Sequence, residues 1–143
     1  MSETNEAVIR TFSSLVIGET ASVKRCITLD DVNAFAALSG DFSPLHADKA
    51  FAASTLFGKQ VVHGMFLGSL VSQLVGMQLP GRYALLLKIE LEFKKPVFID
   101  DTVIVRGILT TKSMSTKIIE VKISITRAHE LIATGKVHVR VLA

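Results

Sequence analysis

The chain of 143 residues contains no tryptophan, one tyrosine and one cysteine, Cys26. A single cysteine excludes an internal disulfide and a multi-cysteine metal site, and it is consistent with a reducing compartment. Because aromatic residues make up only 6% of the chain, a stacking surface for nucleic acid is not expected. The core must instead be built from valine, isoleucine, leucine and alanine.

The sequence also lacks long apolar runs and a targeting segment. The most apolar stretch, residues 65–79, is interrupted by glycine, serine and glutamine, and it is shorter than the roughly 20 residues that span a bilayer. The first twelve residues lack the basic segment and apolar run of a secretory signal. We therefore expect one cytoplasmic domain over residues 1–143, with a flexible tail at residues 1–6 and no membrane partner.

Charge is unevenly distributed along the chain. The net charge of +3 combines −2 over residues 1–81 with +5 over residues 82–143. A basic C-terminal half would suit an anionic ligand such as a phosphate-bearing carrier. From charge alone, solvated outer faces of strands are the favoured explanation.

Two helices are predicted in the first half of the chain. The capping box Thr28-Leu-Asp-Asp31 predicts a helix that begins at residue 29, and Ser39-Gly40 predicts its end. Residues 41–46 contain Pro44, which cannot continue a helix, so this segment is predicted as a loop. A short second helix is expected from Ala47 to about Ser54.

The rest of the chain predicts a helix covered by a sheet. Residues 64–79 are apolar or small almost all round, which requires burial of that helix on most sides. Apolar and polar residues then alternate, as in half-buried strands. The expected strands are 87–93 (with Leu87, Ile89, Leu91 and Phe93 buried), 102–111, 119–125 and 136–141. Their order along the chain implies an antiparallel sheet over the helix, an α+β architecture.

Asp41 and His46 are the first candidates for catalysis. They lie five residues apart around Pro44. A carboxylate and an imidazole on a rigid turn could hold one water and exchange protons with it. By spacing alone, ordinary turn and loop roles for both residues are favoured.

Val62-His63-Gly64-Met65 is the second candidate, because it begins the long helix. The first N–H groups of a helix are unsatisfied and electropositive, and glycine allows a ligand to approach them closely. A thioester carbonyl could bind there. In isolation, tight packing at the helix start is the favoured explanation of Gly64.

Several segments together resemble a known family, the MaoC-like (R)-specific enoyl-CoA hydratases, also called hydratase 2. The similar segments are 38–46, 50–52, 61–65 with Ser69 and Leu70, and 93–101. The resemblance extends over about residues 15 to 143. It implies a hot-dog fold, in which a curled antiparallel sheet wraps around a long central helix.

The resemblance also implies roles for individual residues. Asp41 and His46 match the family's catalytic pair, which binds the attacking water. Gly64 matches the residue whose backbone N–H receives the thioester oxygen. Ser43 stands where the family usually has asparagine, and with Pro44 it would support the catalytic loop.

His63 and Met65 flank Gly64 and are candidates for substrate contact, although a structural role is favoured for His63. A metal site is not expected, because only His46 and Asp41 are close in sequence. The implied chemistry needs no cofactor.

The implied reaction is the syn addition of water to a trans-2-enoyl-CoA, giving an (R)-3-hydroxyacyl-CoA, and the reverse dehydration. The alternatives are a 3-hydroxyacyl-[acyl carrier protein] dehydratase, a hot-dog thioesterase and a non-catalytic acyl-CoA-binding subunit. Which of Asp41 and His46 is the base stays open, because the pair would titrate together. The resemblance further implies a homodimer, and the sequence does not indicate the acyl chain length.

Overall fold

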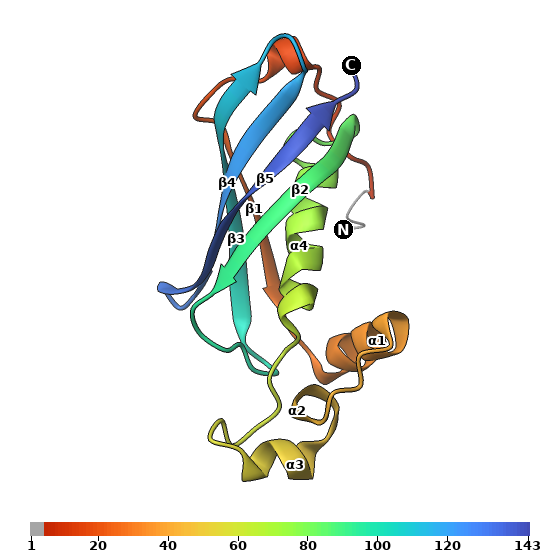
Figure 1. The fold of residues 1–143 in the computed structure, drawn as a ribbon, viewed down its shortest axis with the longest axis vertical. Helices are drawn as coiled ribbons and strands as arrows, with labels where there is room; N and C mark the ends of the chain where they lie inside the picture. The colour runs from red at the N-terminus through yellow and green to blue at the C-terminus, as the bar shows by residue number, and fades with distance from the viewer. Residues whose placement is uncertain (1–4) are drawn as a thin grey trace.

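A five-stranded antiparallel sheet lies against one long helix, and three short helices lie beyond one end of the sheet (Figure 1). The computed structural model describes residues 5–143. The strands are β1 (Thr20–Cys26), β2 (Ala84–Phe93), β3 (Thr102–Ser113), β4 (Ile118–Arg127) and β5 (Glu130–Val141). The helices are η1 (Phe12–Ser14), α1 (Leu29–Ser39), α2 (Pro44–Ala47), α3 (Lys49–Ser54) and α4 (Gly64–Met77). The strand order is β1-β3-β4-β5-β2, and the predicted α+β architecture is confirmed.

The core lies between the sheet and α4. In β4, every second residue from Ile119 to Ile125 is at most 1% exposed, as the alternation predicted. The other core side chains come from β3 and β5 and from α4, whose Val71 and Leu74 are fully buried. Apolar residues at a period of two therefore meet an almost wholly apolar helix.

Two glycines allow close packing at and beside this core. A Cβ atom at Gly107 would lie 2.9 Å from Val121 Cγ1 and 3.0 Å from Leu74 Cδ2, so glycine lets α4 pack directly on the sheet. A Cβ atom at Gly135 would lie 1.8 Å from the Glu90 carbonyl oxygen, so only glycine fits where β5 pairs with β2.

Strand β1 was not predicted from the sequence. Its burial pattern contains a single buried residue, Val23, and therefore shows no apolar alternation. The strand exists because it pairs with β3, from Thr20 opposite Ile108 to Cys26 opposite Thr102. Edge strands that bury little give no period-two signal.

The expected buried face of β2 was wrong. Leu87 is 50% exposed, Ile89 36% and Phe93 45%. Strand β2 is an edge strand, and an irregularity between Leu86 and Lys88 shifts its register against β5. One apolar edge of the molecule is therefore left uncovered.

We call residues 29–62, which include α1, α2 and α3, the helical overhang. Thr28 caps α1 through the Asp31 N–H, and Gly40 ends it in the left-handed conformation, as predicted. The loop expected at residues 41–46 was wrong in part, because Pro44 is the first residue of α2, where a missing N–H costs nothing. The next helix begins at Lys49, because the Asp48 side chain caps it.

The overhang is thinly packed compared with the sheet. Leu38 is 88% exposed, Phe42 62% and Leu56 91%. Its buried side chains are alanines and valines only, Val32, Ala36, Ala52, Val61 and Val62. This part of the chain therefore depends on specific polar contacts for its shape.

At the N-terminus, Val8 bonds through its backbone to Met77 and Arg82. Of the flexible tail predicted at residues 1–6, residues 1–4 lie outside the described residues, and Asn5 and Glu6 are exposed. Within residues 5–143, no helix is long and apolar enough to cross a membrane.

Candidate active site

Asp41 and His46 are held on one turn of the overhang. The Asp41 Oδ1 atom accepts the Ser43 N–H at 3.1 Å, and the Asp41 N–H bonds to Ser39 Oγ at 3.1 Å. The Ser43 carbonyl accepts the His46 N–H at 2.9 Å. Asp41 is exposed and His46 is half-buried. The two residues predicted from the sequence are thus fixed relative to each other by backbone contacts.

Ser43 and Pro44 support this turn through the backbone. Ser43 is the N-cap of α2, but its side chain makes no capping hydrogen bond. Pro44 occupies the first helical position and presets its backbone angle. The Ser43 hydroxyl therefore contributes nothing to the cap.

The tautomer of His46 follows from its partner. Its Nδ1 atom lies 2.6 Å from the carbonyl oxygen of Val61, which can only accept a hydrogen bond. Nδ1 therefore carries the proton, and Nε2 of the neutral ring is left with a lone pair. The Gln60 side chain also donates to the His46 carbonyl at 2.7 Å. His46 is thus oriented as a proton acceptor by residues 60 and 61.

His63 joins the pair from the start of α4, which the sequence spacing did not indicate. It is 1% exposed, its Nε2 atom lies 2.9 Å from the Asp41 carbonyl oxygen, and its ring stacks on His46 with centroids 4.1 Å apart. One potential metal-ligating atom from each of Asp41, His46 and His63 lies within 4.8 Å of the others. The expectation that only Asp41 and His46 are local was therefore wrong. The absence of a metal site remains a prediction.

Gly64 is the first residue of α4. Its N–H has no acceptor within the helix, and no hydrogen bond among residues 5–143 uses it. A Cβ atom at this position would lie 3.1 Å from the Phe93 ring, so the ring closes over the backbone. Met65, the next residue, is 61% exposed. The Gly64 N–H is therefore a donor available to a ligand.

His46 and Gly64 line one cavity of about 470 Å³. Its other walls come from the overhang, from α4, and from the last residue of β2 with the segment that follows it: Phe57, Val61, Val62, Leu67, Phe93, Lys94, Lys95, Pro96 and Val97. A mostly apolar cavity with a few convergent polar groups is typical of small-molecule sites. Phe57, Leu67 and the 93–97 wall were not predicted as parts of the site, although 93–101 was among the family-like segments.

Arg127 braces the 93–97 wall and was not predicted. Its Nη1 atom donates to the Pro96 carbonyl and to Asp101 Oδ2, both at 2.8 Å. Its Nη2 atom donates to Glu130 at 2.9 Å, and Glu130 also pairs with Lys95. Hydrogen bonds from Lys95 and Arg127 lower the pKa of Glu130. Nothing in the sequence connects Arg127 with a wall formed 30 residues earlier.

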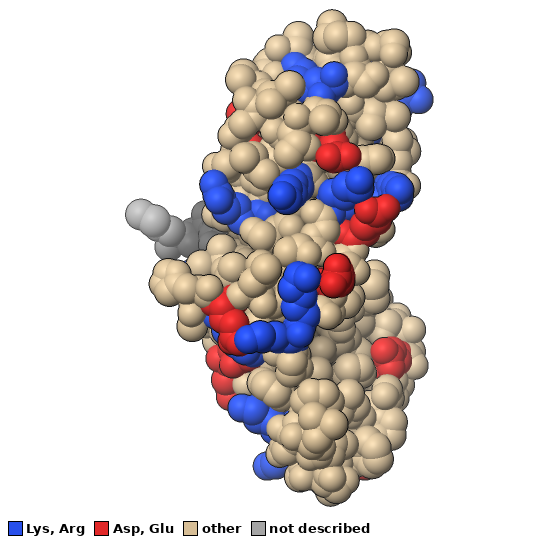
Figure 2. Space-filling view, turned by 60° about the vertical axis from the view of Figure 1, so that its left-hand side comes forward, with Lys and Arg blue, Asp and Glu red and all other residues tan. Residues whose placement is uncertain are grey.

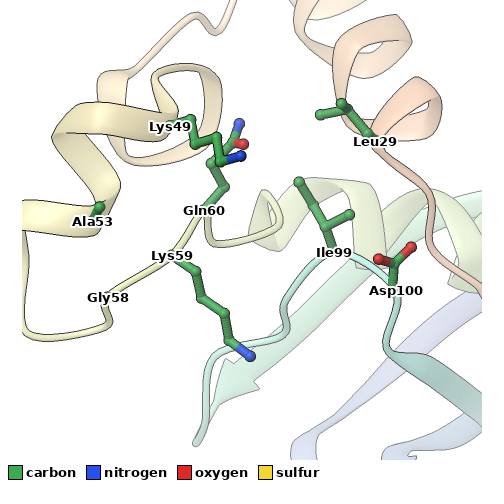
Figure 3. A pocket seen from close by; sticks show the side chains of 8 residues that line it. All are labelled: Leu29, Lys49, Ala53, Gly58, Lys59, Gln60, Ile99 and Asp100. Carbon is green, nitrogen blue, oxygen red and sulfur yellow. The ribbon is translucent and has the colours of Figure 1, made fainter.

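A second hollow, of about 380 Å³, lies between the overhang and the turn before β3 (Figure 3). Lys49, Lys59 and Gln60 line it from the overhang, and Ile99 and Asp100 from the turn. Neither His46 nor Gly64 lines it. Gln60 belongs to this hollow and also bonds to the His46 backbone, so the two cavities share one wall segment.

Comparisons with known proteins find a family model, curated relatives and solved structures that match this chain. A family model described as a MaoC like domain matches residues 16–130. An (R)-specific enoyl-CoA hydratase of Aeromonas caviae is 51% identical over 90 residues, 63% of this chain and 67% of that protein. An (R)-specific enoyl-CoA hydratase of Rhodospirillum rubrum is 30% identical over 139 residues, 97% of this chain and 96% of that protein. The solved structure of the A. caviae (R)-hydratase involved in PHA biosynthesis superimposes with a TM-score of 0.86 at 41% identity, covering 90% of this chain and 98% of that one.

Proposed function

The chain belongs to the MaoC-like domain family, and from this premise we propose that it is an (R)-specific enoyl-CoA hydratase. The hot-dog fold expected from the resemblance is confirmed. The enzyme is a hydro-lyase, which adds water to a trans-2-enoyl-CoA and, in reverse, dehydrates a 3-hydroxyacyl-CoA. The observation that carries the proposal is that a free helix-start N–H, at Gly64, and an oriented imidazole, at His46, line one cavity.

The geometry suggests how the reaction proceeds. The thioester oxygen accepts the Gly64 N–H, which draws electrons from the conjugated double bond and stabilises the enolate that forms. Water bound between the Asp41 carboxylate and His46 Nε2 attacks the β carbon, and its proton passes to the pair. The pair then returns a proton to the α carbon on the same face. Because the His46 Nδ1 proton is held by Val61, Nε2 is the atom of that ring that can accept the proton.

The acyl carrier would lie near the basic side of the cavity. Lys94 and Lys95 line the cavity beside its apolar wall. Lys95 also pairs with Glu130, and Lys94 pairs with Glu92. Cations there would attract a carrier that bears phosphate groups. This arrangement suits coenzyme A and the phosphopantetheine of acyl carrier protein alike, and turnover with each carrier distinguishes them.

Away from the cavity, the basic charge of the C-terminal half lies on solvated strand faces, as the charge distribution alone favoured. Lys136 pairs with Glu90 and Glu120, and His138 bonds to Glu120 at 2.9 Å. Figure 2 shows basic and acidic side chains mixed across the middle of one face of the molecule. These charges belong to solvated strand surfaces and need no ligand.

A homodimer is part of the proposal. Strand β2 is an edge strand, and its apolar residues Leu85, Leu87, Ile89 and Phe93 are exposed, so a second copy that packs along this edge could cover them. Light scattering of the wild-type protein should give twice the chain mass. The Leu87→Glu variant should give the mass of a single chain. A wild-type monomer at micromolar concentration would contradict this.

We also propose a cytoplasmic location. The free, exposed Cys26 is compatible with a reducing compartment.

The function is tested with a panel of C4 to C12 enoyl-CoA substrates and crotonyl-acyl carrier protein. We expect loss of the enoyl-thioester absorbance, a product oxidised by an (R)-specific but not an (S)-specific 3-hydroxyacyl-CoA dehydrogenase, and faster turnover with coenzyme A. Released thiol without hydration would indicate a thioesterase. Substrate binding without either reaction would indicate a non-catalytic subunit.

A further inference from the structure

His63 is the buried polar side chain of residues 5–143, with 1% of its surface exposed. Its Nδ1 atom is buried and has no hydrogen-bond partner among these residues. Leaving a buried polar atom unpaired costs free energy, and an apolar side chain of similar size would avoid that cost. Packing alone therefore does not explain an imidazole at this position.

The hydrogen bond of the other ring nitrogen, Nε2, gives a better explanation for an imidazole at position 63. His63 Nε2 lies 2.9 Å from the backbone carbonyl oxygen of Asp41, 22 residues earlier in the chain. Since a carbonyl oxygen only accepts, Nε2 carries the proton and donates it. This contact links the start of α4 to the turn that carries the Asp41 carboxylate.

The His63 ring makes two further contacts with neighbouring rings. The ring stacks on His46 with centroids 4.1 Å apart and planes inclined by 28°. It also packs against Phe35 of α1, with centroids 4.8 Å apart. His63 is thus in contact with both members of the catalytic pair, through the backbone of Asp41 and the ring of His46.

The backbone of His63 reaches the third element of the site. His63 is the N-cap of α4, its carbonyl accepts the Phe66 N–H at 3.1 Å, and its peptide bond continues into the Gly64 N–H. A shift of His63 would therefore move the carbonyl-binding N–H relative to Asp41 and His46.

We propose that His63 is a positioning residue for hydration: its Nε2–H donor and its ring hold Asp41 and His46 in register with the Gly64 N–H. It does not contact the substrate. The inference rests on the proposed function, and it assigns to His63 a role that no periodicity or spacing in the sequence indicates. Misplacement of catalytic groups by about 1 Å can lower a rate by roughly 100-fold.

Two substitutions separate the donor from the ring. His63→Gln keeps an N–H donor near the Nε2 position and removes the ring, whereas His63→Phe keeps the ring and removes the donor. With crotonyl-CoA, we expect His63→Phe to lower kcat by about 10- to 100-fold with KM changed less than about threefold. His63→Gln should recover a large part of that loss. His129→Asn, at a surface turn of the β4–β5 hairpin where asparagine tolerates the positive φ, is the control and should match wild type.

Any other pattern overturns the proposal. Equal losses in both variants, or a more active His63→Phe, would show that His63 serves packing. A rise in KM at constant kcat would show that it contacts the substrate. Melting temperatures and oligomeric mass are measured for each variant, so that a folding defect is recognised.

A spectroscopic measurement on the wild-type protein tests the inference without activity. Imidazole ¹⁵N shifts at neutral pH should identify the Nε2–H tautomer for His63 and the Nδ1–H tautomer for His46. An Nδ1–H tautomer at His63 would remove the donor to Asp41 and would overturn the proposal. This test needs only the wild-type protein, so it holds even if no variant can be purified. A wild-type protein with these tautomers but no hydratase activity would instead refute the proposed function.

Discussion

The sheet with α4 and the helical overhang are built on different principles. Between the sheet and α4, the side chains are apolar and almost completely buried, as at Leu74 and Ile123. In the overhang, large apolar side chains such as Leu38 and Leu56 are exposed, and the shape depends on polar contacts to single backbone atoms. Stability and chemistry are therefore located in different parts of one small chain.

This difference matters because the catalytic turn is not surrounded by packing. Asp41 and His46 are fixed by individual hydrogen bonds, chiefly to Ser43, Val61 and His63. Substitutions in the sheet should consequently change unfolding more than turnover, and substitutions around the turn should do the reverse.

The largest effect on stability is expected from Leu74→Ala, since Leu74 is fully buried where α4 meets the sheet. The free energy of unfolding, from urea titration, should fall by about 2–5 kcal/mol, while kcat per folded molecule stays near wild type. Leu56→Ala removes the same atoms from a position that is 91% exposed and should change the free energy of unfolding by less than about 0.5 kcal/mol. Similar losses in both variants would break the distinction between the two regions.

At the junction of the two regions, Gly64→Ala should lower kcat by about tenfold, or about 1.4 kcal/mol in the activation free energy. The added Cβ would lie 3.1 Å from the Phe93 ring, which must move into the cavity or away from it. The melting temperature should not fall, because alanine favours the helix. Gly76→Ala on the same helix, where nothing lies within 4 Å, is the matched control. A loss at both positions would point to helix geometry rather than to the carbonyl site.

A smaller effect is expected from the ion pair that joins α1 to β1. A hydrogen bond from Arg25 lowers the pKa of Asp31 below its usual value. A carboxyl with a depressed folded pKa stabilises the protein above its unfolded pKa of about 3.9, and this contribution is lost as pH falls through the folded pKa.

Asp31→Asn keeps an oxygen for the helix cap and removes the charge. Its free energy of unfolding should be lower than that of wild type by less than about 1 kcal/mol at pH 7, because Arg25 is half exposed. Unfolding curves of the two proteins should converge once the pH falls below the depressed folded pKa of Asp31. A difference that stayed constant with pH would show that the charge is not the cause.

The smallest change is expected from Ser43→Asn. The Ser43 side chain makes no capping contact, and asparagine is the residue that the family usually has there. An asparagine side chain can accept a hydrogen bond at the helix start. Turnover should be equal or slightly higher, within about threefold. A large loss measured with crotonyl-CoA would show that the Ser43 hydroxyl has a role of its own.

Much of the sheet could be predicted from the sequence because one face of it is buried. Strands β3, β4 and β5 alternate buried and solvated residues, and this alternation is visible without a structure. Strand β1 buries only Val23, and β2 exposes residues that its alternation placed inside. Sequence patterns predict edge strands poorly for this reason, because the groups that cover an edge strand lie outside the local sequence.

The site could be predicted only in part. Asp41, His46 and Gly64 were identified through a long family-like motif, while their spacing alone did not favour catalysis. The contacts of His63 with Asp41 and of Arg127 with Pro96 join residues 22 and 31 positions apart. Such contacts depend on how α4 and β4 fold back on the chain, which no local pattern encodes.

The measurement that tests the account most directly is crotonyl-CoA hydration by wild type, Asp41→Asn and His46→Gln, with melting temperatures measured in parallel. Asp41→Asn keeps the oxygen that accepts the Ser43 N–H, so the turn should persist. Wild type should consume the enoyl thioester, and each variant should lose about 1,000-fold in kcat at an almost unchanged melting temperature. Variants that fold normally and retain the wild-type rate would contradict the assignment of the chemistry to this turn.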